Sequence, residues 1–297
     1  MESIFLYGAN VHANGIRQHY LRYGGAREGR DAIVLVPGIT SPAVTWGFVA
    51  ETLGRQFDTY VLDVRGRGLS EASSTLDYSL DAQATDLIAF IEALGLKRAS
   101  VLGHSMGARI ALRAARRTKS IARLALVDPP VSGPGRRAYP AQLAWYVDSI
   151  ALARKGIDAE GMRAFCPSWT DEQLRLRAQW LHTCDERAIR ASFEGFHADD
   201  IHADMPHVRQ PALLMTAGKG DVIRNEDIAD MPHVRQPALL MTAGKGDVIR
   251  NEDIAEMREL MPQLEVVNVP DAGHMIPWDD EAGFYRALGS FFGAPLI

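Results

Sequence analysis

This sequence of 297 residues has few cysteines, no large excess of one charge and no long apolar run. Cys166 and Cys184 are the only cysteines, and their spacing matches no metal motif, so we expect reduced thiols and no metal site. The formal net charge of -5 provides no basic surface for nucleic acid or an anionic membrane. No apolar run reaches the ~18 residues of a membrane span. We therefore expect neither nucleic acid nor a membrane as a partner.

The opening stretch, MESIFLYGANVHANG, has no basic region followed by an apolar run and no Arg-rich amphipathic pattern. Such a stretch is not typical of a signal or transit peptide, and the expected location is the cytoplasm. The chain is 47% hydrophobic and 23% charged, which is ordinary for a globular protein of one large or two smaller domains.

Short apolar runs alternate with helical patterns in the first part of the chain. Runs at 32–38, 57–68, 98–107 and 123–130 have the composition of strands buried on both faces of a parallel sheet. The segment 79–96 between two of them has helical spacing. This alternation predicts an α/β fold with a mostly parallel, doubly wound sheet.

The alternation stops after residue 130. Residues 131–203 contain helical stretches and no strand-like run, so we expect a helical cap inserted after strand six. The predicted core then comprises residues 1–130 and 204–297. Strand-like runs return at QPALLMTAGKGD and LEVVNVPDAGH, and a helix is expected near EAGFYRALGSFF.

A segment of 26 residues occurs twice in tandem, at 204–229 and 230–255, without a single difference. A parallel sheet has one position for this strand, so the two copies compete. The second copy continues into a helical pattern, whereas the helix of the first copy meets Pro232. We therefore predict that the second copy enters the fold and that the first is an insertion beside the cap.

The motif Gly103-His104-Ser105-Met106-Gly107 has the G-x-S-x-G form of a nucleophile elbow. A strand-like run precedes it and a strong helix-forming segment follows, which is the context that the elbow requires. Ser105 would lie at a helix N-terminus, where free N–H groups stabilise developing negative charge. The alternative interpretation is an ordinary serine N-cap.

A nucleophilic serine needs a base and an acid that orients the base. Of the nine histidines, His274 is the one that follows the last predicted strand. Asp128 ends one candidate strand, and Asp247, with its duplicate Asp221, ends another. The spacing does not choose between Asp128 and Asp247.

Two backbone N–H groups are candidates for an oxyanion hole. These are the amide of Met106, which follows the nucleophile, and that of Ile39, in the loop after the strand at 32–38. Arg65 and Arg67, in DVRGRGLS, are expected to fix a structural turn rather than to act in catalysis.

With these residues assembled, the chain resembles the α/β-hydrolases, and more closely the N-formylmaleamate deformylases. The resemblance rests on LVPGITSPAVTWGFVAE, FDTYVLDVRGRGLS, LGHSMGAR, LVDPPVSGPGRRAYP and AGHMIPWDD, among other stretches. It implies hydrolysis of a linear amide without a metal or other cofactor, with Asp128 as the acid of a Ser105–His274–Asp128 triad. The duplication departs from the family pattern.

The substrate that this resemblance implies is a small molecule with a carboxylate, which needs a cation. Arg136, Arg137 and Arg109 are the candidates from the sequence. Trp145, Tyr146 and Trp169 are interpreted as helix-packing residues. Two alternatives stay open: an esterase or C–C bond hydrolase on the same scaffold, and a ligand-binding protein without catalysis.

Overall fold

The structure is a computed structural model that describes residues 3–27, 31–217 and 248–296. Eight strands form one sheet in the order β1-β2-β4-β3-β5-β6-β7-β8. The β1–β2 and β2–β4 pairs are antiparallel, and every other pair is parallel. The strands are β1 (Phe5–Ala13), β2 (Ile16–Tyr23), β3 (Ala32–Val36), β4 (Asp58–Leu62), β5 (Ala99–His104), β6 (Ile121–Val127), β7 (Ala212–Ala217) and β8 (Leu264–Val269).

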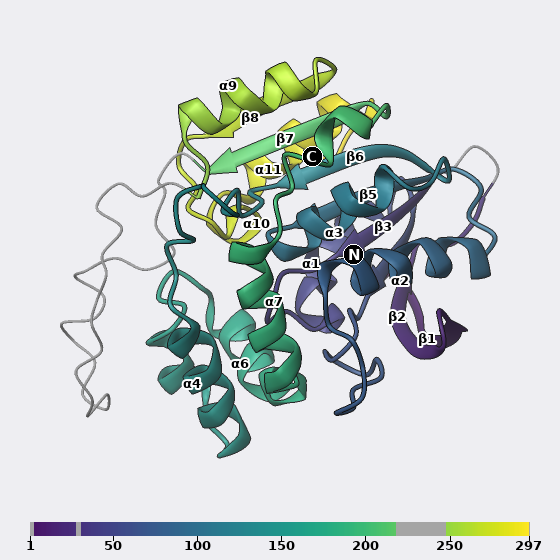
Figure 1. The fold of residues 1–297 in the computed structure, drawn as a ribbon. Coiled ribbons are helices and arrows are strands. Elements are labelled where there is room, and N and C mark those ends of the chain that lie inside the picture. Colours follow the sequence, from purple (N-terminus) through teal and green to yellow (C-terminus); the bar gives the residue numbers. More distant parts are fainter. Residues whose placement is uncertain (1–2, 28–30, 218–247, 297) are drawn as a thin grey trace.

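Helices cover both faces of the sheet (Figure 1). Those of the core are α1 (Gly47–Leu53), α2 (Leu80–Ala93), α3 (Met106–Ala115), α9 (Asn251–Leu260), α10 (Ile276–Asp279) and α11 (Glu281–Phe292). Side chains of β3 alternate between the two hydrophobic cores, because successive residues of a strand point to opposite faces. Val34 and Val36 pack with α2 and α3, whereas Ile33 and Leu35 pack with α1 and α11. This arrangement confirms the predicted α/β fold.

A group of helices lies between β6 and β7 in the sequence and gathers beside the core (Figure 1). It contains α4 (Leu143–Arg154), α5 (Ala159–Arg163), α6 (Asp171–Trp180) and α7 (Glu186–Ala198), and we refer to these helices and their connections as the cap. Short 3-10 helices are η1 (Ala43–Trp46), η2 (Leu181–Thr183) and η3 (Met205–His207). None of the helices among the described residues is long and apolar enough to cross a membrane.

The duplicated segment enters the fold differently from our prediction. The strand comes from the first copy: β7, Ala212–Ala217, pairs with both β6 and β8. The helix comes from the second copy: α9, Asn251–Leu260, buries Met257 and continues towards β8. The placement of the first copy as an insertion was therefore wrong for its strand. The strand-like run of the second copy falls in 218–247, outside the described residues.

The direction in which the chain arrives explains this outcome. The chain leaves α7, passes through η3 and reaches the free edge of β6 with the first copy. The side-chain amide of Gln210 donates to the carbonyls of Ala115 and Thr118, which fixes the start of β7 against the core. The second copy then provides the helix, because only its helical pattern runs on without a proline.

Candidate active site

Ser105 lies at a sharp turn between β5 and α3. Its backbone has φ 52° and ψ -118°, a conformation that costs about 1–3 kcal/mol for a residue other than glycine. The backbone N–H of Ser105 donates to the carbonyl of Val127 at 2.8 Å, which holds the turn against β6. The serine side chain makes no capping hydrogen bond to α3. The geometry therefore favours the elbow over an ordinary N-cap.

The two glycines of the motif are required by close backbone contacts. A Cβ atom on Gly107 would lie 1.9 Å from the carbonyl oxygen of Val36, and one on Gly103 would lie 2.4 Å from that of Gly107. Real Cβ atoms do not approach so closely, so a side chain at either position would push α3 away from β3 or β5. The sequence motif thus reflects tight packing of the helix against the strands.

His274 follows β8 and turns back over the end of the sheet towards Ser105. Its Nε2 atom is 3.0 Å from the Ser105 Oγ atom, so the hydroxyl can donate to it. Its Nδ1 atom is 2.6 Å from the Asp128 Oδ2 atom and donates to this carboxylate. All three residues are at most 5% exposed. The structure thus brings together the serine, the histidine and one of the two candidate acids.

Asp128 follows β6 and has φ 44°, a strained conformation like that of Ser105. Its backbone N–H donates to the carbonyl of Met215 in β7 at 2.8 Å, which holds the residue at the sheet edge. The competing acid Asp247 and its duplicate Asp221 lie outside the described residues.

His104, which occupies the x position before Ser105 in the motif, supports the candidate base His274 from behind. Its Nε2–H donates to the backbone carbonyl of His274 at 3.0 Å, and its ring packs against Trp46. Burial lowers the pKa of His104 to about 3, with a further contribution from His274. A neutral His104 therefore fixes the loop of the base. Sequence reasoning missed this role, since nothing in the motif distinguishes this position.

The two candidate oxyanion donors lie close to Ser105. Met106 is the first residue of α3, and the first N–H groups of a helix have no partner within the helix. Gly38 packs so near Ser105 that a Cβ atom on it would be 3.6 Å from the serine Cβ atom. Ile39 follows directly, so its loop borders Ser105. This proximity favours the expected hole.

Arg67 connects the two candidate oxyanion residues. Its Nε donates to the carbonyl of Ile39 at 3.0 Å, and its Nη2 is 3.4 Å from the Met106 sulfur. The same Nη2 also donates to the Ser192 hydroxyl of α7 at 2.8 Å, and burial lowers the pKa of Arg67 to about 10. Arg67 therefore has the structural role expected from the sequence, and it acts on the loop beside the nucleophile.

Three arginines proposed from the sequence as carboxylate ligands are engaged elsewhere. Arg109 is buried and donates to four backbone carbonyls, including those of Pro130 and Asp199. Arg136 forms a bidentate pair with Glu256, with both distances 2.7 Å. Arg137 pairs with Asp253 at 2.8 Å. These contacts fix the cap and α9 to the core, and they do not favour a role in binding substrate.

Arg177 of α6 is a buried cation that sequence reasoning did not select. It is 3% exposed, and its guanidinium lies 5.6 Å from the ring centres of both Trp145 and Trp169. It donates to the backbone carbonyl and to the hydroxyl of Thr40, each at 3.3 Å. Thr40 follows Ile39 in the candidate oxyanion loop. Helical spacing places Arg177 on the same buried face as Leu174 and Ala178, which indicates that it points inward, but the spacing does not indicate that it meets Thr40.

Two buried tyrosines, Tyr139 before α4 and Tyr146 in α4, have their hydroxyls in contact. The hydroxyls of Tyr139 and Tyr146 are 3.1 Å apart and buried. Burial raises the pKa of Tyr146 to about 12, although the nearby charge of Arg177 acts in the opposite direction. Burial also raises the pKa of Tyr139, and its hydrogen bond with Ser105 lowers it. Both hydroxyls are therefore neutral and can donate to an anion.

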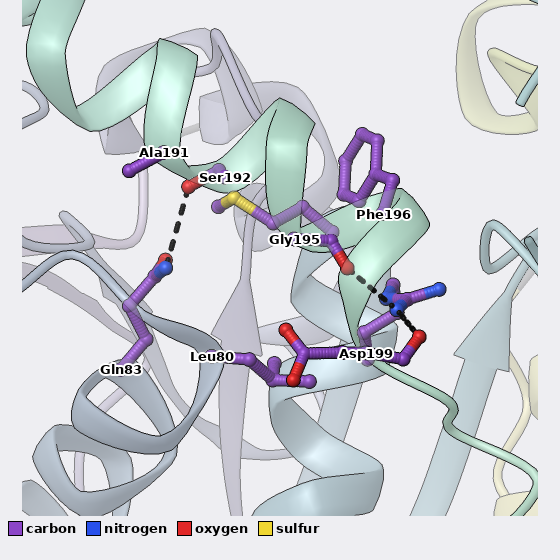
Figure 2. A pocket seen from close by; sticks show the side chains of 9 residues that line it. Leu80, Gln83, Ala191, Ser192, Gly195, Phe196 and Asp199 are labelled. Carbon is purple, nitrogen blue, oxygen red and sulfur yellow. Dashed lines mark hydrogen bonds between the residues drawn. The ribbon is translucent and has the colours of Figure 1, made fainter. Parts of the chain in front are cut away.

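A separate small cavity lies between α2, α3 and α7 (Figure 2). Its volume is about 10 Å³, which is close to the minimum space for one water molecule. Its lining is Leu80, Gln83, Met106, Arg109, Ala191, Ser192, Gly195, Phe196 and Asp199. Neither Ser105 nor His274 lines it, so this cavity is a packing gap behind the elbow. Within the described ranges, no group of acidic, histidine or cysteine side chains could hold a metal ion.

Residues 31–281 match the family described as the alpha/beta hydrolase fold. The chain is 57% identical to N-formylmaleamate deformylase of Pseudomonas putida over 296 residues, which cover 99% of this chain and 100% of the relative. A crystal structure of a serine-to-alanine variant of N-formylmaleamic acid deformylase from Pseudomonas putida is 50% identical. It covers 95% of this chain and 100% of its own, with a TM-score of 0.83.

A more distant structure, that of E-2-(acetamidomethylene)succinate hydrolase, is 20% identical and has a TM-score of 0.72. It covers 98% of this chain and 100% of its own, and it shares the fold. The expected resemblance is thus confirmed: the chain belongs to the α/β-hydrolase family.

Proposed function

We propose that this chain is a serine hydrolase that cleaves the formamide C–N bond of N-formylmaleamate and releases formate and maleamate. The observation that carries the proposal is the 57% identity, over nearly the whole chain, to a deformylase of this substrate. The hydrogen-bonded set of Ser105, His274 and Asp128 provides the chemistry that such a reaction needs.

The first half of the reaction forms a formyl-enzyme. The Ser105 Oγ atom attacks the formyl carbon while His274 accepts the hydroxyl proton, and Asp128 stabilises the resulting imidazolium. The amides of Ile39 and Met106 donate to the oxyanion. His274 then gives the proton to the departing nitrogen, and the C–N bond breaks. The leaving group is the amide nitrogen of maleamate, which departs more readily than an amine, so the proposed chemistry involves no cofactor.

The second half returns the enzyme to its starting state. A water molecule gives a proton to His274 and attacks the formyl carbon of the ester. Collapse of this second tetrahedral intermediate releases formate, and Ser105 recovers its proton from His274. Cys166 and Cys184 are buried free thiols, as is common in a reducing compartment, and we place this reaction in the cytoplasm.

The direct test is formate release from N-formylmaleamate by the purified protein and by its Ser105→Ala variant. We expect the variant to lose at least about 10⁴-fold in kcat while keeping the fold and substrate binding, since loss of the nucleophile removes the covalent route. No formate release by a folded wild-type protein would refute the deformylase proposal. Turnover of simple esters in that case would favour the alternative, a carboxylesterase or C–C bond hydrolase.

A further inference from the structure

Arg177 has the fewest polar partners of the five buried arginines. Arg65 pairs with Asp86, and Arg113 pairs with Asp204. No ion pair joins Arg177 to an acid in the parts of the chain that the structure describes.

Arg67 and Arg109 form no ion pair among the described residues either, but each donates four hydrogen bonds to protein oxygen atoms, whereas Arg177 donates two. Its Nε atom is buried without a hydrogen-bond partner. A buried charge that has neither a counter-ion nor a full set of hydrogen bonds is costly, which indicates that the missing partner of Arg177 arrives with a ligand.

The surroundings of Arg177 suit an anion. Trp145 and Trp169 flank the guanidinium and exclude water from it, so an ion pair formed there is weakly screened. Trp169 in turn stacks on Trp278 at 5.0 Å with an interplanar angle of 6°, which fixes it against the loop of His274. The two hydrogen bonds to Thr40 are long, at 3.3 Å, and a carboxylate would replace them with shorter ones.

Arg177 is also connected to the nucleophile through a chain of contacts. Thr40 places it against the loop of Ile39, and Gly38 of the same loop packs against Ser105. A substrate whose scissile carbonyl lies at Ser105 would therefore extend along this loop, and its far end would reach the arginine. That far end is a carboxylate in N-formylmaleamate.

We propose that Arg177 is the specificity-determining residue that binds the terminal carboxylate of the substrate, with Tyr146 as an additional donor. A planar guanidinium binds a carboxylate through two parallel hydrogen bonds. The identity of the substrate rests on the proposed function, whereas the requirement for a carboxylate rests on the site itself. The site accordingly selects short amides or esters that carry one negative charge at the leaving-group end.

The test uses a matched pair of esters, 3-carboxyphenyl acetate and its neutral analogue 3-carbamoylphenyl acetate. The charged ester has as many bonds between the scissile carbonyl and the carboxylate as N-formylmaleamate has. We expect Arg177→Gln to lower kcat/KM for the charged ester about 10- to 100-fold, mainly through KM, and that for the neutral ester by less than about 3-fold. The kcat/KM of Arg177→Lys for the charged ester should lie between the values for the wild type and for Arg177→Gln.

Arg136→Gln provides the matched control, because Arg136 is an arginine of the cap boundary that already pairs with Glu256. This variant should keep the wild-type preference for the charged ester. An equal loss on both esters in a folded Arg177→Gln protein would overturn the proposal.

A measurement on the wild-type protein keeps the proposal testable if the variant does not fold. Maleamate should inhibit at a concentration at least about 10-fold lower than the neutral diamide of maleic acid, and equal inhibition constants would overturn the inference. The two proposals can fail separately. Absence of formate release, together with an Arg177-dependent preference for the charged ester, would refute the deformylase function and retain the carboxylate site.

Discussion

The core side and the cap side of the site are built in different ways. On the core side, Ser105 and Asp128 both have positive φ angles and follow neighbouring strands, so the backbone of the sheet fixes their side chains. On the cap side, Arg177 is positioned by the rings of Trp145 and Trp169. The core thus holds the reacting groups through strand geometry, whereas the cap holds the specificity group through side-chain packing.

The largest effect in the core is expected from Asp128→Asn. Loss of the charge leaves the imidazolium of His274 without its counter-ion and disturbs the tautomer of the base, so we expect about a 10⁴-fold fall in kcat with the fold retained. Formate release measures this effect. Asp247→Asn and Asp221→Asn are the matched controls and should stay within about 3-fold of wild type. A large loss in either control with a mild effect at Asp128 would reassign the acid.

A smaller effect is expected behind the base. His104→Leu removes the hydrogen bond to the His274 carbonyl, and we expect about a 10-fold loss of kcat. His104→Gln can still donate to this carbonyl and should keep most of the activity. If Leu and Gln variants of equal stability had the same activity, the positioning role of His104 would be wrong.

The lowered pKa of His104 predicts that the stability of the protein depends on pH. The pKa of His104 falls to about 3 on folding, so the unfolded chain binds one more proton than the folded chain between pH 3 and its ordinary pKa of 6.5. Stability that depends on a neutral His104 is therefore present above pH 6.5 and is lost as the pH falls towards 3. Denaturant unfolding from pH 7 to 4 should show a steeper loss for wild type than for His104→Gln, by up to about 1.4 kcal/mol per pH unit.

The smallest effect is expected from removal of one copy of the duplicated segment. Deletion of 204–229 gives the same sequence as deletion of 218–243, because the two copies are identical. The shortened chain keeps one strand for β7 and one helix for α9, which are the parts that the fold uses. We expect kcat/KM within about 3-fold of wild type and an equal or higher melting temperature. A large loss of activity would show that the extra residues contribute to the site.

Much of the core could be predicted from the sequence, because its signals are local. The apolar runs anticipated β3 to β6, and G-x-S-x-G flanked by strand and helix patterns anticipated the elbow at Ser105. The spacing alone left two candidate acids, and the folded geometry placed Asp128 at His274. The hairpin of β1 and β2 was not predicted, although Asn14-Gly15, with both φ angles positive, is a typical hairpin turn.

The cap side could not be predicted, because its contacts join residues far apart in the chain. Arg177 meets Thr40 across 137 positions, and its partners Trp145 and Trp169 belong to separate segments of the cap. The prediction for the duplicated segment was wrong for a related reason. Two identical strands have the same local preferences, so only the path of the chain from α7 to the edge of β6 decides which copy forms β7.

The most direct measurement is kcat/KM for N-formylmaleamate and for its neutral analogue, in which a carboxamide replaces the carboxylate, with formate release as the readout. We predict that Asp128→Asn lowers both values by about the same factor, since it acts on the chemistry. We predict that Arg177→Gln lowers only the value for the charged substrate. Equal losses on both substrates in the folded Arg177→Gln protein would contradict the division between a catalytic core and a carboxylate-binding cap.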